Sequence, residues 1–167
     1  VPGADSLDFR DLAILDENTV LLMSSGEAEN GAAKVFRTEN GGLSWELAHQ
    51  IKEKGYFFDA IIWEGKQGLI LSDPAGPFYG LIRISEKGKA FQLLNPISHP
   101  ELQKGEAAFA ASGSSLQKTK EGYYIVTGGG EKARVLLSED ALNWKSIYAE
   151  IPGGEGTGFF SLGVRNA

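Results

Sequence analysis

The sequence predicts an all-β chain that forms part of a β-propeller, and three observations support this prediction. Short runs rich in Val, Ile, Leu and aromatic residues are bounded by Gly, Asn, Asp and Pro, which is typical of strands joined by tight turns. No segment shows a sustained helical period. One hairpin pattern recurs about every 50 residues, and β-rich repeats of that length are typical of four-stranded propeller blades.

The clearest copy of this hairpin is the stretch 38–45, which fits the pattern Ser/Thr-x-Asp/Asn-x-Gly-x-Ser/Thr-Trp of an Asp-box, or BNR repeat. An Asn-Gly pair supplies residues that accept positive φ angles, and the hydroxyl and amide side chains suit hydrogen bonds to the loop's own backbone. The tryptophan offers a large apolar plug. We therefore predict a structural, turn-stabilising role for Thr38, Asn40, Gly42, Ser44 and Trp45.

Two shortened copies of the hairpin follow, at 85–91 and 138–144. Their closing aromatic residues, together with Trp45, are spaced 46 and 53 residues apart, at Phe91 and Trp144. The strand before each hairpin carries an arginine, and this regular placement favours side chains that face solvent as part of the repeat: Arg37, Arg83 and Arg134.

Each repeat is expected to open with an apolar strand that lines the propeller axis, at 9–15, 57–63 and 107–112, and a fourth opening strand is expected at 157–165. We therefore predict three four-stranded antiparallel blades plus the first strand of a fourth, with boundaries at 1–50, 51–98, 99–152 and 153–167. Because a closed propeller needs about four to eight blades, we expect an excerpt of a longer propeller. Its open ends would contact the remaining blades or self-associate through exposed strand edges.

Composition narrows the possible partners. The 167 residues carry a net charge of −6, which argues against nucleic acid as the partner. No apolar run approaches the ~20 residues of a membrane-spanning helix. Cysteine is absent, the two histidines (His49 and His99) read as surface polar positions, and the glycine-rich stretch 128–132 does not fit a phosphate-binding loop. We therefore predict no cofactor and no metal site.

Several phrases resemble a group of bacterial BNR-repeat propellers of the sialidase-like superfamily, usually described as photosystem II stability/assembly-factor-like and sometimes as glycosyl hydrolase or oxidoreductase. The phrases are DFRD (8–11), FFDA (57–60), LSDP (71–74), GEAAFAASG (105–113), ARV (133–135) and GFFSL (158–162). The resemblance implies a seven-bladed propeller about twice as long as this chain, with one blade before it and about three after it. It also favours a periplasmic or secreted location. The shortened hairpins depart from the family pattern, which argues against a binding role for them.

Acidic residues on the opening strands are the candidate catalytic groups. Aligning the strands places Asp11, Asp59 and Glu106 at matching positions near one end of the channel. Burial and mutual repulsion would raise their pKa values, as a general acid requires, and glycoside hydrolysis uses paired carboxylates. The alternative is structural: these side chains cap strand ends, pair with Arg10 or hydrogen-bond to neighbouring backbone.

The candidate ligand-binding residues are Arg10, Asp73, Phe78 and Tyr79. Asp73 begins a loop that continues to residue 80, and loops on a rigid scaffold commonly carry binding residues. The two aromatic rings would stack on a sugar or seat a peptide, or else pack within the blade. Arg10 is the one arginine on an opening strand that lies beside an aspartate.

These observations leave three functions open. The first is a non-enzymatic, assembly-factor-like propeller scaffold that binds a protein or peptide, and the resemblance and the lack of a cofactor or nucleophile motif favour it. The alternative is a carbohydrate-active propeller, either a glycoside hydrolase or a glycan-binding module, that uses the channel-mouth carboxylates. The third is a purely structural spacer.

Overall fold

The computed structural model describes residues 1–111 and 113–164, and in these residues it contains three four-stranded antiparallel sheets. The first sheet consists of β1 (Asp8–Ile14), β2 (Val20–Ser25), β3 (Lys34–Thr38) and β4 (Glu46–Gln50). The second consists of β5 (Phe58–Glu64), β6 (Gln67–Pro74), β7 (Tyr79–Ser85) and β8 (Ala90–Leu93). The third consists of β9 (Leu116–Thr119), β10 (Gly122–Thr127), β11 (Lys132–Ser138) and β12 (Lys145–Pro152). Two short 3₁₀ turns complete these elements, η1 (Ala28–Asn30) and η2 (Gly113–Ser115).

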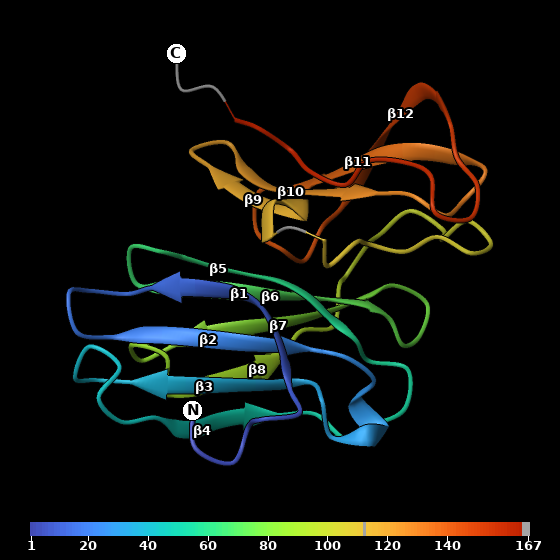
Figure 1. The fold of residues 1–167 in the computed structure, drawn as a ribbon. Helices are drawn as coiled ribbons and strands as arrows, with labels where there is room; N and C mark the ends of the chain where they lie inside the picture. The colour runs from blue at the N-terminus through green and yellow to red at the C-terminus, as the bar shows by residue number, and fades with distance from the viewer. Residues whose placement is uncertain (112, 165–167) are drawn as a thin grey trace.

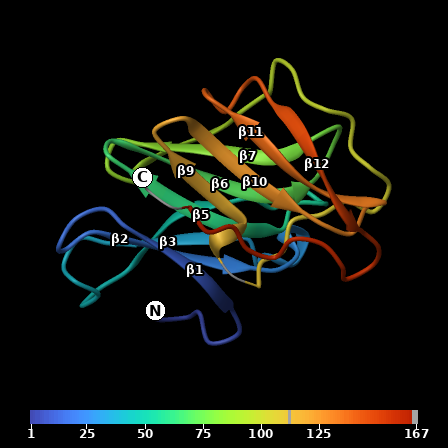
Figure 2. The same cartoon turned by 90° about the horizontal axis from the view of Figure 1, so that it is seen from above.

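Within each sheet the strands follow one another in sequence order, so every sheet is a simple meander. The sheets meet along their first strands, because β1 contacts β5 and β5 contacts β9 (Figure 1). Seen from above, the three sheets spread outward from these inner strands (Figure 2). This is the architecture of a partial β-propeller, as the sequence predicts.

The prediction of an opening strand at 107–112 is wrong. In its described part, residues 107–111, the only pairing is an isolated bridge between Ala107 and Gly128. The first strand of the third sheet is instead β9, which starts at Leu116, a fully buried residue. The Ala-rich run has the apolar composition of a strand, but its small side chains let it pass close to neighbouring loops, where the Ala108 amide donates to Asp73 Oδ1 at 3.0 Å.

The expected fourth opening strand, at 157–165, does not form as a strand in its described part, residues 157–164, although isolated backbone pairing joins this segment to the end of β10. Gly158 bridges Gly128, and the Phe159 amide donates to the carbonyl of Thr127 at 3.2 Å. The final residue of the predicted strand, Arg165, lies outside the described residues.

The middle sheet, β5–β8, is buried on both faces. Along its strands alternate residues point to opposite sides, so Ile70 and Ile82 pack with the first sheet while Leu71 and Leu81 pack with the third. This explains why the middle strands read as continuous apolar runs. A strand with one solvent-facing side would alternate apolar and polar residues.

The first hairpin, 38–45, is closed by its own polar side chains. The Thr38 hydroxyl accepts from the amide of Gly42 at 3.0 Å, and Asn40 Oδ1 accepts from the amide of Ser44 at 2.9 Å. The indole of Trp45 donates to the Gly42 carbonyl at 3.1 Å. Trp45 remains half-buried, so it covers the side of the turn rather than filling a closed core.

The third hairpin, 138–144, repeats this bonding with one residue fewer. Asp140 Oδ1 accepts from the amides of Leu142 and Asn143, both at 2.8 Å, and the Trp144 indole donates to the carbonyl of Ala141 at 3.1 Å. These hydrogen bonds, together with the Asn143 amide side chain, hold the pKa of Asp140 well below its ordinary value. Trp144 of this hairpin is buried, whereas Trp45 of the first hairpin is half-buried.

The second hairpin, 85–91, has no Asp or Asn to bind the turn. It uses backbone geometry instead, with successive positive φ angles of 51°, 54° and 80° at Glu86, Lys87 and Gly88. Amides of Gly88 and Lys89 donate to the Ser85 carbonyl at 3.0 and 3.2 Å. Gly88 is also required by space, because a Cβ there would lie 2.9 Å from the Leu21 side chain of the first sheet.

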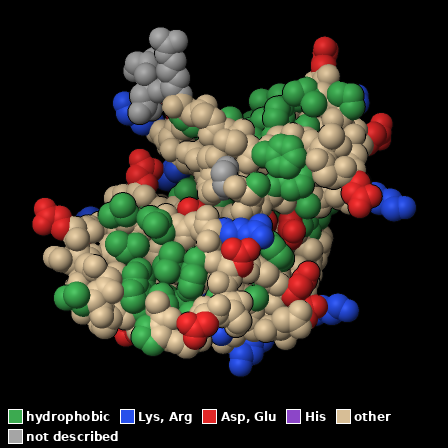
Figure 3. All heavy atoms as spheres, in the orientation of Figure 1, with side chains coloured by type: hydrophobic (Ala, Val, Ile, Leu, Met, Phe, Trp, Pro, Cys, Tyr) green, Lys and Arg blue, Asp and Glu red, His purple; other side chains and the backbone are tan. Residues whose placement is uncertain are grey.

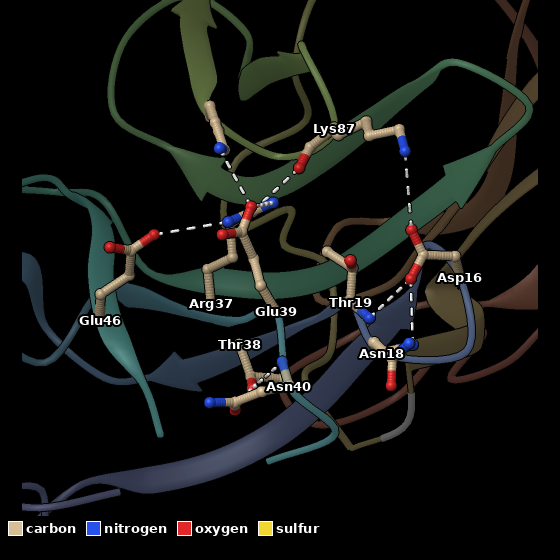
Figure 4. A network of polar contacts seen from close by, with 10 residues as sticks. Asp16, Asn18, Thr19, Arg37, Thr38, Glu39, Asn40, Glu46 and Lys87 are labelled. Carbon is tan, nitrogen blue, oxygen red and sulfur yellow. Dashed lines mark hydrogen bonds and ion pairs between the residues drawn. The ribbon is translucent and has the colours of Figure 1, made fainter. Parts of the chain in front are cut away.

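Arginines on the third strands join each sheet to the hairpin of the next. Arg37 Nε donates to the Lys87 carbonyl at 2.9 Å, and an Arg83 Nη donates to the Asp140 carbonyl at 3.3 Å. Lys87 and Asp140 occupy the same third position of their hairpins. Figure 4 shows the first of these contacts, with Glu39 and Glu46 beside the guanidinium.

The prediction that the third-strand arginines face solvent is therefore wrong for two of them. Arg37 is only 2% exposed and Arg134 is fully buried, while Arg83 is half-buried. Arg37 and Arg83 each contact the hairpin of the next sheet, whereas Arg134 contacts the segment that precedes its own sheet.

The first sheet keeps one apolar face open. A cross-strand row runs through Leu12, Leu22, Phe36 and Leu47, and its two end residues are about half exposed. Figure 3 shows apolar side chains gathered over this sheet on the side turned to the viewer in Figure 1. The opposite face, which includes Leu21, packs against the middle sheet.

The Arg37 contact yields a stability prediction. Arg37→Ala removes a buried guanidinium, its ion pair with Glu39 at 2.6 Å and its hydrogen bond to the next sheet. We expect the free energy of unfolding to fall by about 2–4 kcal/mol. Arg83→Ala is the matched control, because its more exposed side chain makes one long hydrogen bond, and it should cost less than about 1 kcal/mol. Urea unfolding of both variants measures this, and equal losses would contradict the inter-sheet role of Arg37.

Candidate functional site

The candidate site lies at the start of β5, the inner strand of the middle sheet. The 85–91 hairpin lies at the opposite end of this sheet. At the site, β5 starts, β6 ends and β7 starts, and the segment 101–111 passes on its way to the third sheet. Polar side chains meet in this region, most of them buried: Asp59, Asp73, Tyr79, Glu106 and Arg134.

β-bulges aim the two aspartates of this site. The β5–β6 register skips Asp59 between Phe58 and Ala60, and the β6–β7 register skips Asp73. An extra residue in a strand turns its side chain out of the regular alternation, and bulges of this kind are common beside functional sites.

The pairing registers of β1 and β5 correct the sequence alignment of the opening strands, which placed Asp11 and Asp59 at matching positions. In β1 the skipped residue is Arg10, between Phe9 and Asp11. Arg10 is therefore the structural counterpart of Asp59, and Asp11 lies one position further on. Because side chains alternate between faces, this single-residue offset separates Asp11 from Asp59.

Asp11 has a structural role in this arrangement. Its two carboxylate oxygens accept from the backbone amides of Leu12 at 2.8 Å and Ile61 at 2.7 Å, and the second of these bonds joins β1 to β5. Burial raises the pKa of Asp11, while these two amides oppose the increase. Each carboxylate oxygen thus accepts one backbone amide, and one of these two hydrogen bonds holds β1 and β5 together.

Glu106 is likewise engaged, in a buried ion pair with Arg134. Its two oxygens accept from Arg134 at 2.8 and 2.6 Å, and one of them also accepts from the Gln103 amide at 2.9 Å. Arg134 further donates to the carbonyl of Glu101 at 2.9 Å and to the hydroxyl of Tyr148 at 3.3 Å. This geometry anchors the 101–106 segment to β11.

Asp59 and Asp73 form an electrostatically coupled pair. Asp59 is 1% exposed, and its Oδ2 has no hydrogen-bond partner among the described residues. Burial raises its pKa well above the ordinary value, and the charge of Asp73 raises it further, whereas Arg10 lowers it. Burial also raises the pKa of Asp73 to about 6, against its hydrogen bond from Ala108, and Glu27 adds to the increase. The sequence pattern singled out both residues but did not predict this pairing.

Arg10 does not contact the aspartate pair. Its guanidinium forms an exposed ion pair with Asp8 at 2.7 Å and acts on Asp59 through its charge alone.

Phe78 and Tyr79 pack into the core and do not present open aromatic faces. Phe78 stacks on His99 with ring centroids 4.6 Å apart and contacts Tyr79 edge-on at 5.5 Å. Burial raises the pKa of Tyr79 well above its ordinary value, and its hydroxyl has no hydrogen-bond partner among the described residues. This packing does not favour stacking of a sugar ring on either side chain.

A groove beside these residues was not predicted from the sequence. It consists of two adjoining hollows of about 270 and 260 Å³ that share Tyr56 and Leu93. We call it the Tyr56 groove. Two side chains expected to be surface polar positions line it: His99 packs on Phe78, and His49 stacks on Phe91 with ring centroids 4.6 Å apart. No motif marks these residues, because they come together only through packing between successive sheets.

Among the described residues, no group of three or more His, Cys, Asp and Glu side chains is arranged to hold a metal ion. Within the same part of the chain, no helix has the length and apolar character needed to cross a membrane.

The fold and this site define a partial β-propeller with buried carboxylates where its inner strands begin. Neither the protein-family models nor the curated proteins include a match. Among solved structures, the chain is similar to one described as "YCF48 bound to D1 peptide", with a TM-score of 0.61 and 17% sequence identity. The match covers 89% of this chain and 42% of that chain, so this chain spans less than half of that protein's length. At this identity the similarity shows a shared fold.

The raised pKa of Asp73 yields a prediction about pH. The ordinary value of 3.8 applies to the unfolded chain, and the folded value is about 6. The folded state therefore binds this proton more tightly, so the contribution of Asp73 to stability is complete below pH 4 and is lost as pH rises through 6. Relative to wild type, Asp73→Asn should gain up to about 3 kcal/mol in free energy of unfolding between pH 4 and pH 7.

Urea unfolding at several pH values measures this difference. Asp5→Asn, a change at an exposed aspartate, is the control and should show no such trend. A difference between Asp73→Asn and wild type that stays constant across this range would show that the environment of Asp73 is not as described.

Proposed function

We propose that this chain is part of a non-enzymatic propeller scaffold that binds a protein partner through a peptide segment. The observation that carries the proposal is the fold, which is shared with a structure described as bound to a peptide. We further propose that 1–50, 51–98 and 99–152 each form one blade, that 153–167 belongs to the next, and that the residues of the 38–45 hairpin stabilise its turn as an Asp-box.

The geometry of the carboxylates supports a binding role over glycoside hydrolysis. Hydrolysis needs two accessible carboxyl groups on opposite sides of the scissile bond. Asp11 is occupied by two backbone amides and Glu106 by Arg134, so neither is available to a substrate. Asp59 and Asp73 remain, and Asp59 is buried. No contact in the site favours the carbohydrate-active alternative.

Two binding screens of the purified chain test this proposal. A phage-displayed decapeptide library should yield a family of related peptides that bind with roughly micromolar dissociation constants, as is common for transient recognition. A glycan array and aryl-glycoside substrates should give no signal. Hydrolysis of a glycoside that is abolished by Asp59→Asn, with an unchanged melting temperature, would overturn the non-enzymatic assignment.

A further inference from the structure

The Tyr56 groove has the form of a peptide-binding surface. Its two hollows adjoin, since Tyr56 and Leu93 line both of them. One hollow reaches toward β4 through His49 and Ile51, and the other toward the linker to the third sheet through Pro96 and His99. The groove therefore crosses the middle sheet from the side of the first sheet to the side of the third.

The walls of the groove include several apolar and aromatic side chains. Leu93 stands 46% exposed at the junction of the hollows, a large apolar side chain left open to solvent. Tyr56 lies against Gly80, where an added Cβ would come within 2.8 Å of the tyrosine ring, so only glycine leaves room for it. Pro77 and the buried Phe78 also line the hollow that contains His99. Such walls favour apolar or aromatic side chains as occupants.

The groove also lies at the end of a free strand edge, because Leu93 is the one residue of β8 that lines the hollows. β8 is the outermost strand of the middle sheet, paired with β7 on one side only, and it ends at Leu93. An extended peptide can lie along an edge of this kind and send alternate side chains into adjacent pockets.

The charged residues near the groove indicate which charge a bound peptide should carry there. Glu53 lines the hollow that contains His49 and is exposed. Burial lowers the pKa of His49, and the charge of Glu53 partly opposes this shift. Burial raises the pKa of Tyr56, and the charge of Glu53 adds to the increase. No lysine or arginine lines either hollow. Glu53 is the one acidic residue that lines the hollows, so complementarity to a basic residue is local to its carboxylate, which lies between the exposed Lys52 and Lys54.

We propose that the Tyr56 groove binds an extended peptide segment that places an apolar side chain in each hollow and a Lys or Arg beside Glu53. This inference rests on the proposed function, since it names the surface and the peptide chemistry through which the scaffold acts. It assigns recognition to the surface of the groove, which adjoins the carboxylate site at Tyr79 but is not lined by Asp59, Asp73 or Glu106.

Fluorescence anisotropy with defined probes tests the proposal. The probe is a fluorescein-labelled decapeptide with two leucines on alternate positions and one flanking lysine, and its partner probe carries glutamate in place of the lysine. The lysine peptide should bind at least tenfold more tightly than the glutamate peptide. Glu53→Gln should reduce this preference to less than about threefold.

Matched leucine variants locate the binding surface. Leu93→Gln should weaken binding of the lysine peptide at least tenfold, because it replaces the apolar side chain at the junction of the hollows with a polar one that carries no charge. Leu43→Gln should leave binding unchanged, since Leu43 is 90% exposed on the 38–45 hairpin and lines neither hollow. Leu93→Ser replaces Leu93→Gln if the melting temperature of the latter falls.

The outcomes separate this inference from the proposed function. Binding that survives both changes at Leu93 but is lost in Asp73→Asn would overturn the groove and leave peptide binding intact. Tighter binding of the glutamate peptide than of the lysine peptide would overturn the proposal that a Lys or Arg of the peptide lies beside Glu53. Failure of both probes, when the phage library does yield binders, contradicts the groove alone, whereas failure of the library as well contradicts the proposed function.

Discussion

The constraint on which the rest of the structure depends is the double burial of the middle sheet. Residues on both sides of β6 and β7, such as Ile70 and Leu71, lie in separate apolar clusters shared with the first and third sheets. Neither neighbouring sheet can move away without exposing one of these clusters to water. This fixes the inner strands side by side and brings the start of β5 against the segment that leads to the third sheet.

Polar contacts between sheets then divide into two groups. In the first group the hydrogen-bonding groups find partners, as in the arginine of β3 that reaches the next hairpin, the Asp11 carboxylate and the Glu106–Arg134 pair. The first two contacts set the position of one sheet relative to the next, and the Glu106–Arg134 pair fixes the 101–106 segment on the third sheet. In the second group, Asp59 and Tyr79 have buried polar atoms without a hydrogen-bond partner among the described residues. Burying such atoms costs free energy of folding.

Much of the fold follows from the sequence, because period-two patterns and turn residues report on local structure. The opening strands of the first two sheets, expected at 9–15 and 57–63, are predicted to within one residue at each end. The third inner strand is not, since the run at 107–112 has strand-like composition while the true strand at 116–119 is short and polar. The Asp59–Asp73 pair depends on two β-bulges and on the packing of β5 against β6, and no sequence pattern specifies a bulge in advance. The Tyr56 groove arises between sheets and leaves no periodic signal.

Native-state hydrogen exchange tests the central role of the middle sheet most directly. If burial on both faces holds the arc together, backbone amides of β6 and β7 should exchange only through global unfolding, with the highest protection in the chain. Amides of the first and third sheets should exchange earlier, through local opening that leaves the middle sheet intact. Exchange of β6 and β7 that is as fast as exchange of β2 or β10 would contradict the account.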